Sequence, residues 1–408
     1  MVKHNTDGEI RQTMLELLIF AITYLLIAFQ KMFPKFDRAS IALIGATAMI
    51  ACGVLSLKQA VESVDYDTIV LLFGMMVVSS YLGKSGFFDF VAGKMVSKAK
   101  SGRKLLLAVV LISGFLSAFL VNDVVCIFMT PIVVRMAVLS EMNPIPLLLA
   151  LSTSANIGSC ATIVGNPQNM LIAMKLHIPF TEFLRVLLPV SLVSLFICYL
   201  TLLAIFGSDV KAMKPKKFEF EPDKPMMIRM LVILGITVFL FVSEVFPPPV
   251  AALIGATLAM VFGGQRPKDV MRNIDWNLLV FFAGLFVVVA GFEKGGWMKG
   301  LEGMRVVTLK DYVMFSGATV ILSNLISNVP FVMVALPMVK TKKLAYLLAM
   351  ASTFAGNLTL IGSVANVIVA ETADSLGVRI SFGDYLKIGL PLTLITVAFG
   401  TVAIYFWG

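Results

Sequence analysis

Long apolar segments alternate with short charged turns along this 408-residue chain. Apolar runs at about 13–30, 39–57, 68–83 and 183–206 each approach the roughly 20 residues that a helix needs to cross a bilayer. The segment 86–104 differs, because it can place phenylalanines on one helical face and lysines on another, which is typical of a helix lying in the membrane interface. The pattern predicts an all-α polytopic membrane protein.

One apolar segment, at about 146–173, is interrupted by a dense polar stretch at 152–169. Non-helical backbone inside a bilayer survives only where protein or a water-filled cavity satisfies it. Gly158 and Gly165 permit unusual backbone angles, and Pro167 removes a hydrogen-bond donor. We therefore expect a broken helix that lines a binding site. The alternative is that its Asn and Ser side chains only join neighbouring helices.

The segment 105–140 carries the polar pair Asn122-Asp123 at its centre. In a single helix Asp123 would lie near mid-bilayer, at an insertion cost of roughly 2.5 to 3.5 kcal/mol. Two half-length helices that meet at this pair would avoid that cost, so we expect a re-entrant hairpin in which the pair caps the second helix.

A polar linker at 207–225 divides the chain, and the order of elements repeats after it. The expected counterparts are spans at about 228–243, 250–263 and 276–292, an amphipathic piece at 297–305, a hairpin at 311–340, a broken helix at 344–370 and a last span at 385–407.

Individual residues of the two halves match in the same order. The motif ALIGAT occurs at 42–47 and at 252–257. The other matched positions are Asp65 with Asp275, Asn122 with Asn328, Thr162 with Thr359, Gly165 with Gly362, and Asn169 with Asn366. Each half holds five crossings and one hairpin, and because five is odd the second half must be inverted relative to the first. We expect a first inverted repeat at 1–206, the linker at 207–225 and a second inverted repeat at 226–408.

Composition agrees with this architecture, since 59% of the residues are hydrophobic and 14% are charged. The net charge of +9 does not indicate a nucleic-acid partner, because Lys and Arg lie in short loops between apolar spans, as the positive-inside rule describes. The loops at 31–38, 84–104, 211–224 and 266–272 fall on one face and hold most of these residues. We expect that face and the linker 207–225 to be cytoplasmic, with both termini external, in a multi-pass protein of the cell (inner) membrane that contacts lipid.

Cysteine and histidine add little chemistry. The four cysteines are dispersed within apolar segments without paired spacing, which is typical of buried small residues. The chain has two histidines, too few for a multi-histidine metal site. No cofactor is expected.

Four segments resemble the ArsB/NhaD branch of the ion transporter superfamily, with its arsenite permeases, sodium/proton antiporters and plant silicic-acid efflux transporters. They read FLVNDVVCIFMTPIVV, SANIGSCATIVGNPQNMLIA, IDWNLLVFFAGLFVVVAGFEKGG and LISNVPFVMVALP. More distantly, the chain is similar to the dicarboxylate/sodium symporters. The resemblance covers nearly the whole chain. It implies a central site between two hairpins and two broken helices, in an elevator-type transport domain that moves against a dimerised scaffold.

The hairpin tips depart from the symporter pattern. Those symporters carry Ser-Asn-Thr at each tip, whereas this chain reads Val121-Asn122-Asp123 and Ser327-Asn328-Val329. Since only the Asn is common to both, a dicarboxylate cargo is less favoured.

Amides, hydroxyls and freed backbone groups at the tips and breaks form the expected binding site, because they can hydrogen-bond a hydroxyl-rich solute or complete the shell of an ion. The candidate substrate- or ion-binding residues are Asn122, Asp123, Asn156, Gly158, Ser159, Thr162, Gly165, Asn166, Asn169, Ser327, Asn328, Thr359, Gly362, Ser363 and Asn366. A sodium ion is a further possibility at Asn122, Asp123 and Gly158.

Asp123 is the deciding residue, because neither polar stretch contains a Lys or Arg to pair with it. We expect it to take up and release a coupling proton or to bind sodium; the alternative is a plain helix cap. A lone acidic group repels a dianion, which favours a neutral metalloid acid such as arsenite or silicic acid, or a cation.

The predicted function is secondary active transport of a small inorganic solute, either such a metalloid oxyacid or an anion, coupled to H⁺ or Na⁺. The alternatives are a sodium-coupled dicarboxylate or anion symporter, a sodium/proton antiporter and, remotely, a passive channel. An intramembrane enzyme is disfavoured, since no nucleophile can be placed beside a base.

Overall fold

The computed structural model describes residues 3–32, 35–210, 213, 222–297 and 306–408, and these residues fold into helices with no strand among them. Seven of the described helices are long and apolar enough to cross a membrane. The predicted all-α, multi-spanning fold is confirmed. The amphipathic piece expected at 297–305 lies, beyond its first residue, outside the described residues.

The first half of the chain follows the predicted order of spans, interfacial helix, hairpin and broken helix. Its helices are α1 (Lys3–Ala28), α2 (Arg38–Ala51), α3 (Leu57–Glu62), α4 (Tyr66–Lys84), α5 (Phe87–Lys98), α6 (Gly102–Phe119), α7 (Asn122–Leu139), α8 (Pro144–Ser159), α9 (Pro167–Lys175) and α10 (Phe180–Phe206).

The second half repeats this order. Its described helices are α11 (Lys224–Ser243), α12 (Pro248–Phe262), α13 (Pro267–Met271), α14 (Trp276–Lys294), α16 (Leu309–Ile326), α17 (Asn328–Ala335), α18 (Lys342–Ala355), α19 (Val364–Ser375) and α20 (Phe382–Trp407).

The first hairpin differs from the prediction in length. Its arms α6 and α7 have 18 residues each, so each is about 27 Å long at 1.5 Å per residue. They are therefore not half-length helices. In the second hairpin, α16 also has 18 residues, but α17 has only 8.

Matched aspartates start matched helices. The side chain of Asp65 accepts a hydrogen bond from the Thr68 N–H at 2.9 Å at the start of α4, and Asp275 accepts from the Leu278 N–H at 3.0 Å at the start of α14. Such caps satisfy backbone donors that have no partner within the helix. The same local chemistry therefore begins the same element in each half.

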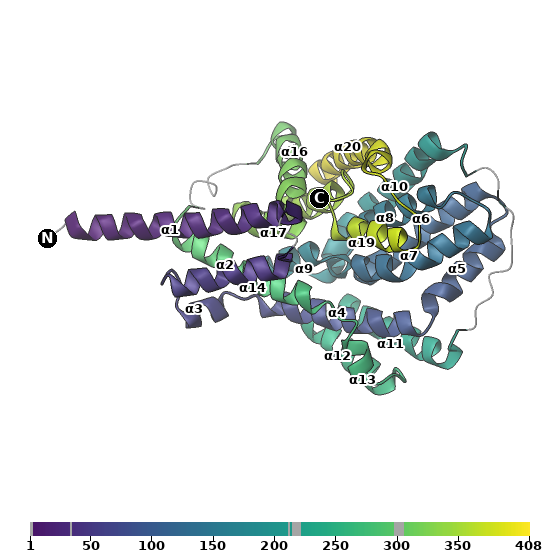
Figure 1. Cartoon of the computed structure of the whole chain (residues 1–408), viewed down its shortest axis with the longest axis horizontal. Coiled ribbons are helices and arrows are strands. Elements are labelled where there is room, and N and C mark those ends of the chain that lie inside the picture. Colours follow the sequence, from purple (N-terminus) through teal and green to yellow (C-terminus); the bar gives the residue numbers. More distant parts are fainter. Residues whose placement is uncertain (1–2, 33–34, 211–212, 214–221, 298–305) are drawn as a thin grey trace.

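Two groups of helices can be followed in Figure 1. The first, which we call the frame, contains α1, α2, α4, α11, α12 and α14 and occupies the left and lower part of the view. Each half contributes three of these helices, and the halves pack on each other: α2 packs on α14, and α4 packs on α12.

The packing inside the frame occurs twice. Gly74 of α4 lies against the backbone of Ala252 in α12, and Gly284 of α14 lies against the backbone of Ala42 in α2. Glycine at both places lets the helix axes approach closely, as is common between membrane helices. Equivalent contacts in both halves support the two-repeat fold.

The second group, which we call the core unit, contains both hairpins, both broken helices, α10 and α20, and it fills the upper right of Figure 1. Here α6 packs along α8, α7 against α8 and α19, and α10 against α20. Gly158 of α8 touches the backbone of Gly114 in α6 so closely that a Cβ at Gly158 would overlap it.

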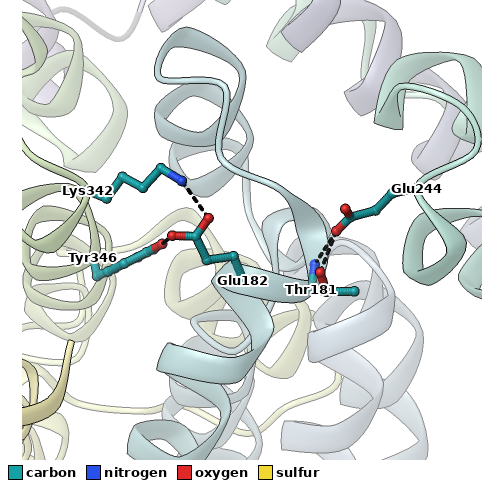
Figure 2. A network of polar contacts seen from close by, with 5 residues as sticks. All are labelled: Thr181, Glu182, Glu244, Lys342 and Tyr346. Carbon is teal, nitrogen blue, oxygen red and sulfur yellow. Dashed lines mark hydrogen bonds and ion pairs between the residues drawn. The ribbon is translucent and has the colours of Figure 1, made fainter.

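Polar contacts at the start of α10 join elements from both halves (Figure 2). Glu182 forms an ion pair with Lys342 of α18 at 2.6 Å and accepts a hydrogen bond from the Tyr346 hydroxyl at 2.8 Å. The adjacent Thr181 donates its backbone N–H to Glu244 at 3.0 Å and its hydroxyl to the same oxygen. Since Glu244 ends α11, this last contact links the core unit to the frame.

We expect Gly158→Ala to lower the stability of the protein by about 1 to 3 kcal/mol, because the added methyl group meets backbone that cannot move aside easily. Gly235→Ala in α11 is the matched control, since nothing lies within 4 Å of its added Cβ. Thermal unfolding in detergent measures both. Equal midpoints for the two variants would contradict the packing described between α6 and α8.

Candidate transport site

Both broken helices leave helical geometry in a short segment, which is buried in the first half and partly exposed at 358–361 in the second. In the first half α8 ends at Ser159, a 3-10 turn covers Ile163–Gly165, and α9 begins at Pro167 after Asn166, whose side chain accepts from the Asn169 N–H at 2.9 Å. In the second half α18 ends at Ala355, and α19 begins after Ser363. Both predicted breaks are confirmed.

One asparagine clamps each break by donating to two backbone carbonyls, one where the first helix segment ends and one inside the break. The Asn169 amide donates to the carbonyls of Ser159 at 3.1 Å and Thr162 at 2.9 Å. The Asn366 amide donates to the carbonyls of Gly356 at 2.6 Å and Thr359 at 3.2 Å. Both asparagines are fully buried and do not line the cavity described below. The structure thus uses them to hold the breaks in shape.

Asn156 is the hub that joins the two halves. Its amide group donates to the side-chain oxygens of Asn357 at 2.9 Å and Asn366 at 3.0 Å. Its oxygen accepts from the Asn122 amide at 3.2 Å and the Ser363 hydroxyl at 3.0 Å. Because an Asn side chain has two donor hydrogens and two acceptor lone pairs, every hydrogen-bonding position of Asn156 is occupied.

The remaining polar candidates hydrogen-bond to groups around the breaks and do not line the cavity. Asn166 donates to the Ser159 hydroxyl at 2.9 Å and to the Thr353 hydroxyl at 3.2 Å. The Thr162 hydroxyl donates to the Ala118 carbonyl, and the Thr359 hydroxyl to the side-chain oxygen of Asn324 at 3.0 Å.

The glycine candidates are packing positions. Gly158 faces α6, Gly165 lies against the backbone of Ser159, and Gly362 lies against the side chain of Asn324 and the carbonyls of Gly356 and Thr359. Gly158 could offer sodium only its backbone carbonyl, and that carbonyl already accepts the Ala161 N–H at 3.0 Å. Of the three expected sodium ligands, Asn122 and Asp123 keep a free side-chain oxygen.

A cavity of about 690 Å³ lies between the frame and the core unit. Five of the expected site residues line it: Asn122, Asp123, Ser327, Asn328 and Ser363. They come from both hairpin tips and the second break, so the structure brings together residues far apart in the sequence. The frame contributes Asp37 and Arg38 of the α2 start and Asp275 and Asn277 of the α14 start, and Glu371 of α19 is also in the wall.

Asn122 and Asp123 present free acceptor oxygens to this cavity. Asn122 is 5% exposed, and its side-chain oxygen has no hydrogen-bond partner among the described residues. No side chain or backbone group of the described chain donates to the Asp123 carboxylate. The expectation that this pair caps α7 is wrong, because the cap position is Val121 and no side chain caps this helix. The pair faces the cavity instead.

Sequence reasoning missed Arg38. It is separated from both polar stretches in the chain, yet the fold places it in the cavity wall, where its Nη1 donates to the Ser327 hydroxyl at 3.4 Å. Neither polar stretch contains a basic residue, as expected, but the folded protein adds Arg38 to the cavity that Asp123 lines. The available signal was its position at the first residue of an apolar span, beside charged Asp37.

Paired broken helices that meet at a buried amide network, beside a polar cavity in a multi-pass helical chain, define a membrane transporter. The chain belongs to the citrate transporter family, whose match covers residues 24–345. The resemblance to the ArsB/NhaD branch is confirmed, and this family and the named relatives are transporters rather than enzymes.

Relatives match over nearly the full length. The chain is 28% identical to a silicon efflux transporter of Oryza sativa subsp. japonica over 93% of this chain and 95% of the relative. It is also 28% identical to a putative transporter, arsB, of Dictyostelium discoideum, over 89% of this chain and 86% of the relative. An uncharacterised transporter of Mycobacterium bovis is 28% identical over 95% of this chain and 96% of the relative.

Two solved structures share the fold. The YdaH transporter of Alcanivorax borkumensis matches with a TM-score of 0.57 and 12% identity, over 96% of this chain and 98% of that chain. MtrF of Neisseria gonorrhoeae, from a class described as antimetabolite efflux pumps, matches with a TM-score of 0.50 and 11% identity, over 90% and 84% of the two chains. At this level of identity the likeness concerns the fold alone.

We expect Asn169→Ala and Asn366→Ala each to destabilise the protein. Each change leaves two break carbonyls without their amide donor, at a cost of about 1 to 3 kcal/mol for each group left buried and unsatisfied, and Asn366→Ala also removes an acceptor of the Asn156 amide. Thermal unfolding of the purified variants measures the loss. A wild-type midpoint for either one would refute its role as a clamp.

Proposed function

We propose that the protein is a secondary active transporter for a small metalloid oxyacid, arsenite or silicic acid, coupled to a proton or sodium gradient. The free acceptor oxygens of Asn122 and Asp123 beside the cavity are the main support. A neutral molecule rich in hydroxyl groups supplies donors to these oxygens and accepts from serine hydroxyls. The names of the rice and Dictyostelium relatives support the same cargo.

Transport of an anion is the second candidate, and Arg38 is the observation that favours it. The family is named for citrate, and a guanidinium in the wall offers a carboxylate or oxyanion a partner. The same wall holds four carboxylates, those of Asp37, Asp123, Asp275 and Glu371, so a highly charged anion meets more repulsion than attraction. The symporter and antiporter alternatives rest on this same cavity.

For the mechanism we propose an elevator-type movement of the core unit against the frame, in a homodimer embedded in lipid. The cavity lies between the two groups of helices. Hydrogen bonds that cross this boundary include those from the Tyr24 hydroxyl to the Pro330 carbonyl at 3.1 Å, from Arg38 to Ser327, and from Thr181 to Glu244. Such contacts are broken and remade when one group moves past the other.

Asp123 is the proposed coupling residue. The charged and titratable groups that share its cavity are Asp37, Arg38, Asp275 and Glu371. The first three lie at the starts of the frame helices α2 and α14. A movement of the core unit changes the distance from Asp123 to these charges, because Asp123 belongs to the first hairpin. Proton uptake and release would then follow the position of the core unit.

We expect Asp123→Asn to abolish metalloid-driven proton flux. The measurement uses purified protein in liposomes with a trapped pH dye, in sodium-free buffer, to which arsenite or silicic acid is added under an imposed proton gradient. Wild type should show a flux that depends on the solute, and Asp123→Asn should fall to the rate of protein-free liposomes, because an amide does not titrate.

The matched control is Asp65→Asn, which removes an aspartate that caps α4 outside the cavity wall; it should keep the flux. If Asp123→Asn carried the same flux as wild type, Asp123 would not be the coupling residue. A flux that requires sodium together with an anion would favour the symporter alternative.

We further propose that the protein lies in the inner membrane with its linker cytoplasmic and both termini external. The cavity then opens to the cytoplasm, since Asp37 and Arg38 end the loop expected on that face at 31–38 and Asp275 follows the one expected at 266–272. Cys52 follows α2 and is exposed, while the other three cysteines are buried, so Cys52 should be external.

We expect a membrane-impermeant maleimide to label wild type in right-side-out vesicles, through Cys52, and to leave Cys52→Ser unlabelled. In that background, Asn277→Cys at the cavity wall should be labelled only in inside-out vesicles. The reversed pattern would reverse the orientation.

A further inference from the structure

Arg38 is a charged group for which the described chain supplies no ion pair. It begins α2 and is half-buried in the wall of the cavity, and the bond to the Ser327 hydroxyl, at 3.4 Å, is its single hydrogen bond within the described residues. That bond is long for an N–H donor. Since a guanidinium carries five donor hydrogens in a planar fork, most of its binding capacity is unused.

The nearest acidic residues of the frame are engaged elsewhere. Asp37 accepts a hydrogen bond from the Ser40 N–H at 2.7 Å, and Asp275 accepts one from the Leu278 N–H at 3.0 Å. Both carboxylates therefore cap helices. A half-buried charge without a partner is costly, so the position of Arg38 requires a reason beyond folding.

The other half of the chain shows that a frame helix does not need an arginine at this position. Arg38 lies four residues before the ALIGAT motif of α2, and Pro248 lies four residues before the same motif in α12. Both helices begin there, and both pack in the same manner on α14 or α4. The helix starts at the same position in both halves, but the arginine occurs at that position only in the first half.

Hydrogen-bond donors gather beside Arg38 at the second hairpin tip. Ser327 adopts the backbone angles φ 78° and ψ 153°, a strained region for a residue with a side chain, and α17 starts directly after it. The first turn of a helix presents N–H groups that favour negative charge. The acceptors lie in the same cavity, where the buried oxygen of Asn122 has no donor and the Asp123 carboxylate is free.

We propose that Arg38 is a specificity-determining residue, which binds the ionised oxygen of a singly charged oxyacid while Asn122 and Asp123 accept from its remaining hydroxyl groups. A fully neutral acid leaves Arg38 unpaired, and a multiply charged anion places additional negative oxygens against the carboxylates of Asp37, Asp123, Asp275 and Glu371 in the cavity wall. This inference rests on the proposed function, because the cavity is the one in which that function places the cargo. The neutral form of an oxyacid binds through Asn122 and Asp123 alone, and the singly charged form binds more tightly because it also pairs with Arg38.

The test measures ligand-induced thermal stabilisation of the purified full-length protein, titrated with three probes. Inorganic phosphate at mildly acidic pH is the singly charged oxyacid, arsenite is the neutral oxyacid, and citrate is the multiply charged carboxylate. The variants are Arg38→Gln and Arg38→Lys. Arg103→Gln is the control, because it removes an exposed arginine at the start of α6, outside the cavity wall.

Phosphate should stabilise wild type at lower concentration than citrate does. Arg38→Gln should weaken the phosphate effect by roughly tenfold to a hundredfold, the usual cost of losing a hydrogen bond to a charged group. Arg38→Lys should recover part of the loss because it keeps the charge. Arsenite should act equally on wild type and Arg38→Gln, and Arg103→Gln should match wild type throughout.

Three results would overturn the proposal: no phosphate effect in wild type, an unchanged phosphate effect in Arg38→Gln, or an equal loss for arsenite and phosphate. Unliganded unfolding midpoints show whether a variant is folded, and if Arg38→Gln is not, the partial loss in Arg38→Lys decides. Phosphate binding that depends on Arg38, together with absent metalloid flux in liposomes, would refute the proposed cargo and leave the role of Arg38 intact.

Discussion

The structure depends on one constraint: the backbone groups that the two broken helices leave unpaired must find hydrogen-bond partners within the protein. Each broken helix frees carbonyl groups that no helical N–H reaches, and one buried asparagine amide in each half donates to two of them. Without these donors the breaks would carry unsatisfied polar groups, which lipid and apolar protein do not tolerate. With them, each irregular segment keeps a defined conformation.

Because the breaks are held internally, other polar groups are available to face the cavity. Asn156 uses all of its hydrogen-bonding capacity to join the halves, whereas its neighbour Asn122 keeps one buried oxygen free. The acidic residues divide in the same way, since Asp37 and Asp275 cap helices and Asp123 accepts no bond from the described chain. Residues of the same types thus divide between those that hold the fold and those that face the cavity with a free oxygen.

The spans were predictable from apolar runs, the breaks and hairpin tips from the polar residues that interrupt those runs, and the repeat from residues that match in the same order in both halves, because all of these signals can be read directly from the sequence. Contacts between distant elements were not predictable. The amide bonds of Asn169 and Asn366 to backbone carbonyls, the occupied hub at Asn156 and the presence of Arg38 in the cavity all depend on the folded structure. The length of the α6 and α7 arms was also missed, since a polar pair at the centre of a segment locates a turn without limiting the helices on either side.

The two clamps record the history of the protein. Asn169 and Asn366 make the same bonds to matching carbonyls, and Gly74 and Gly284 make the same approach to matching alanines. Duplication of a single unit that already contained the break would produce both halves. Arg38 faces no counterpart, since Pro248 stands in its place; the two sides of the fused protein therefore diverged in charge while their architecture stayed the same.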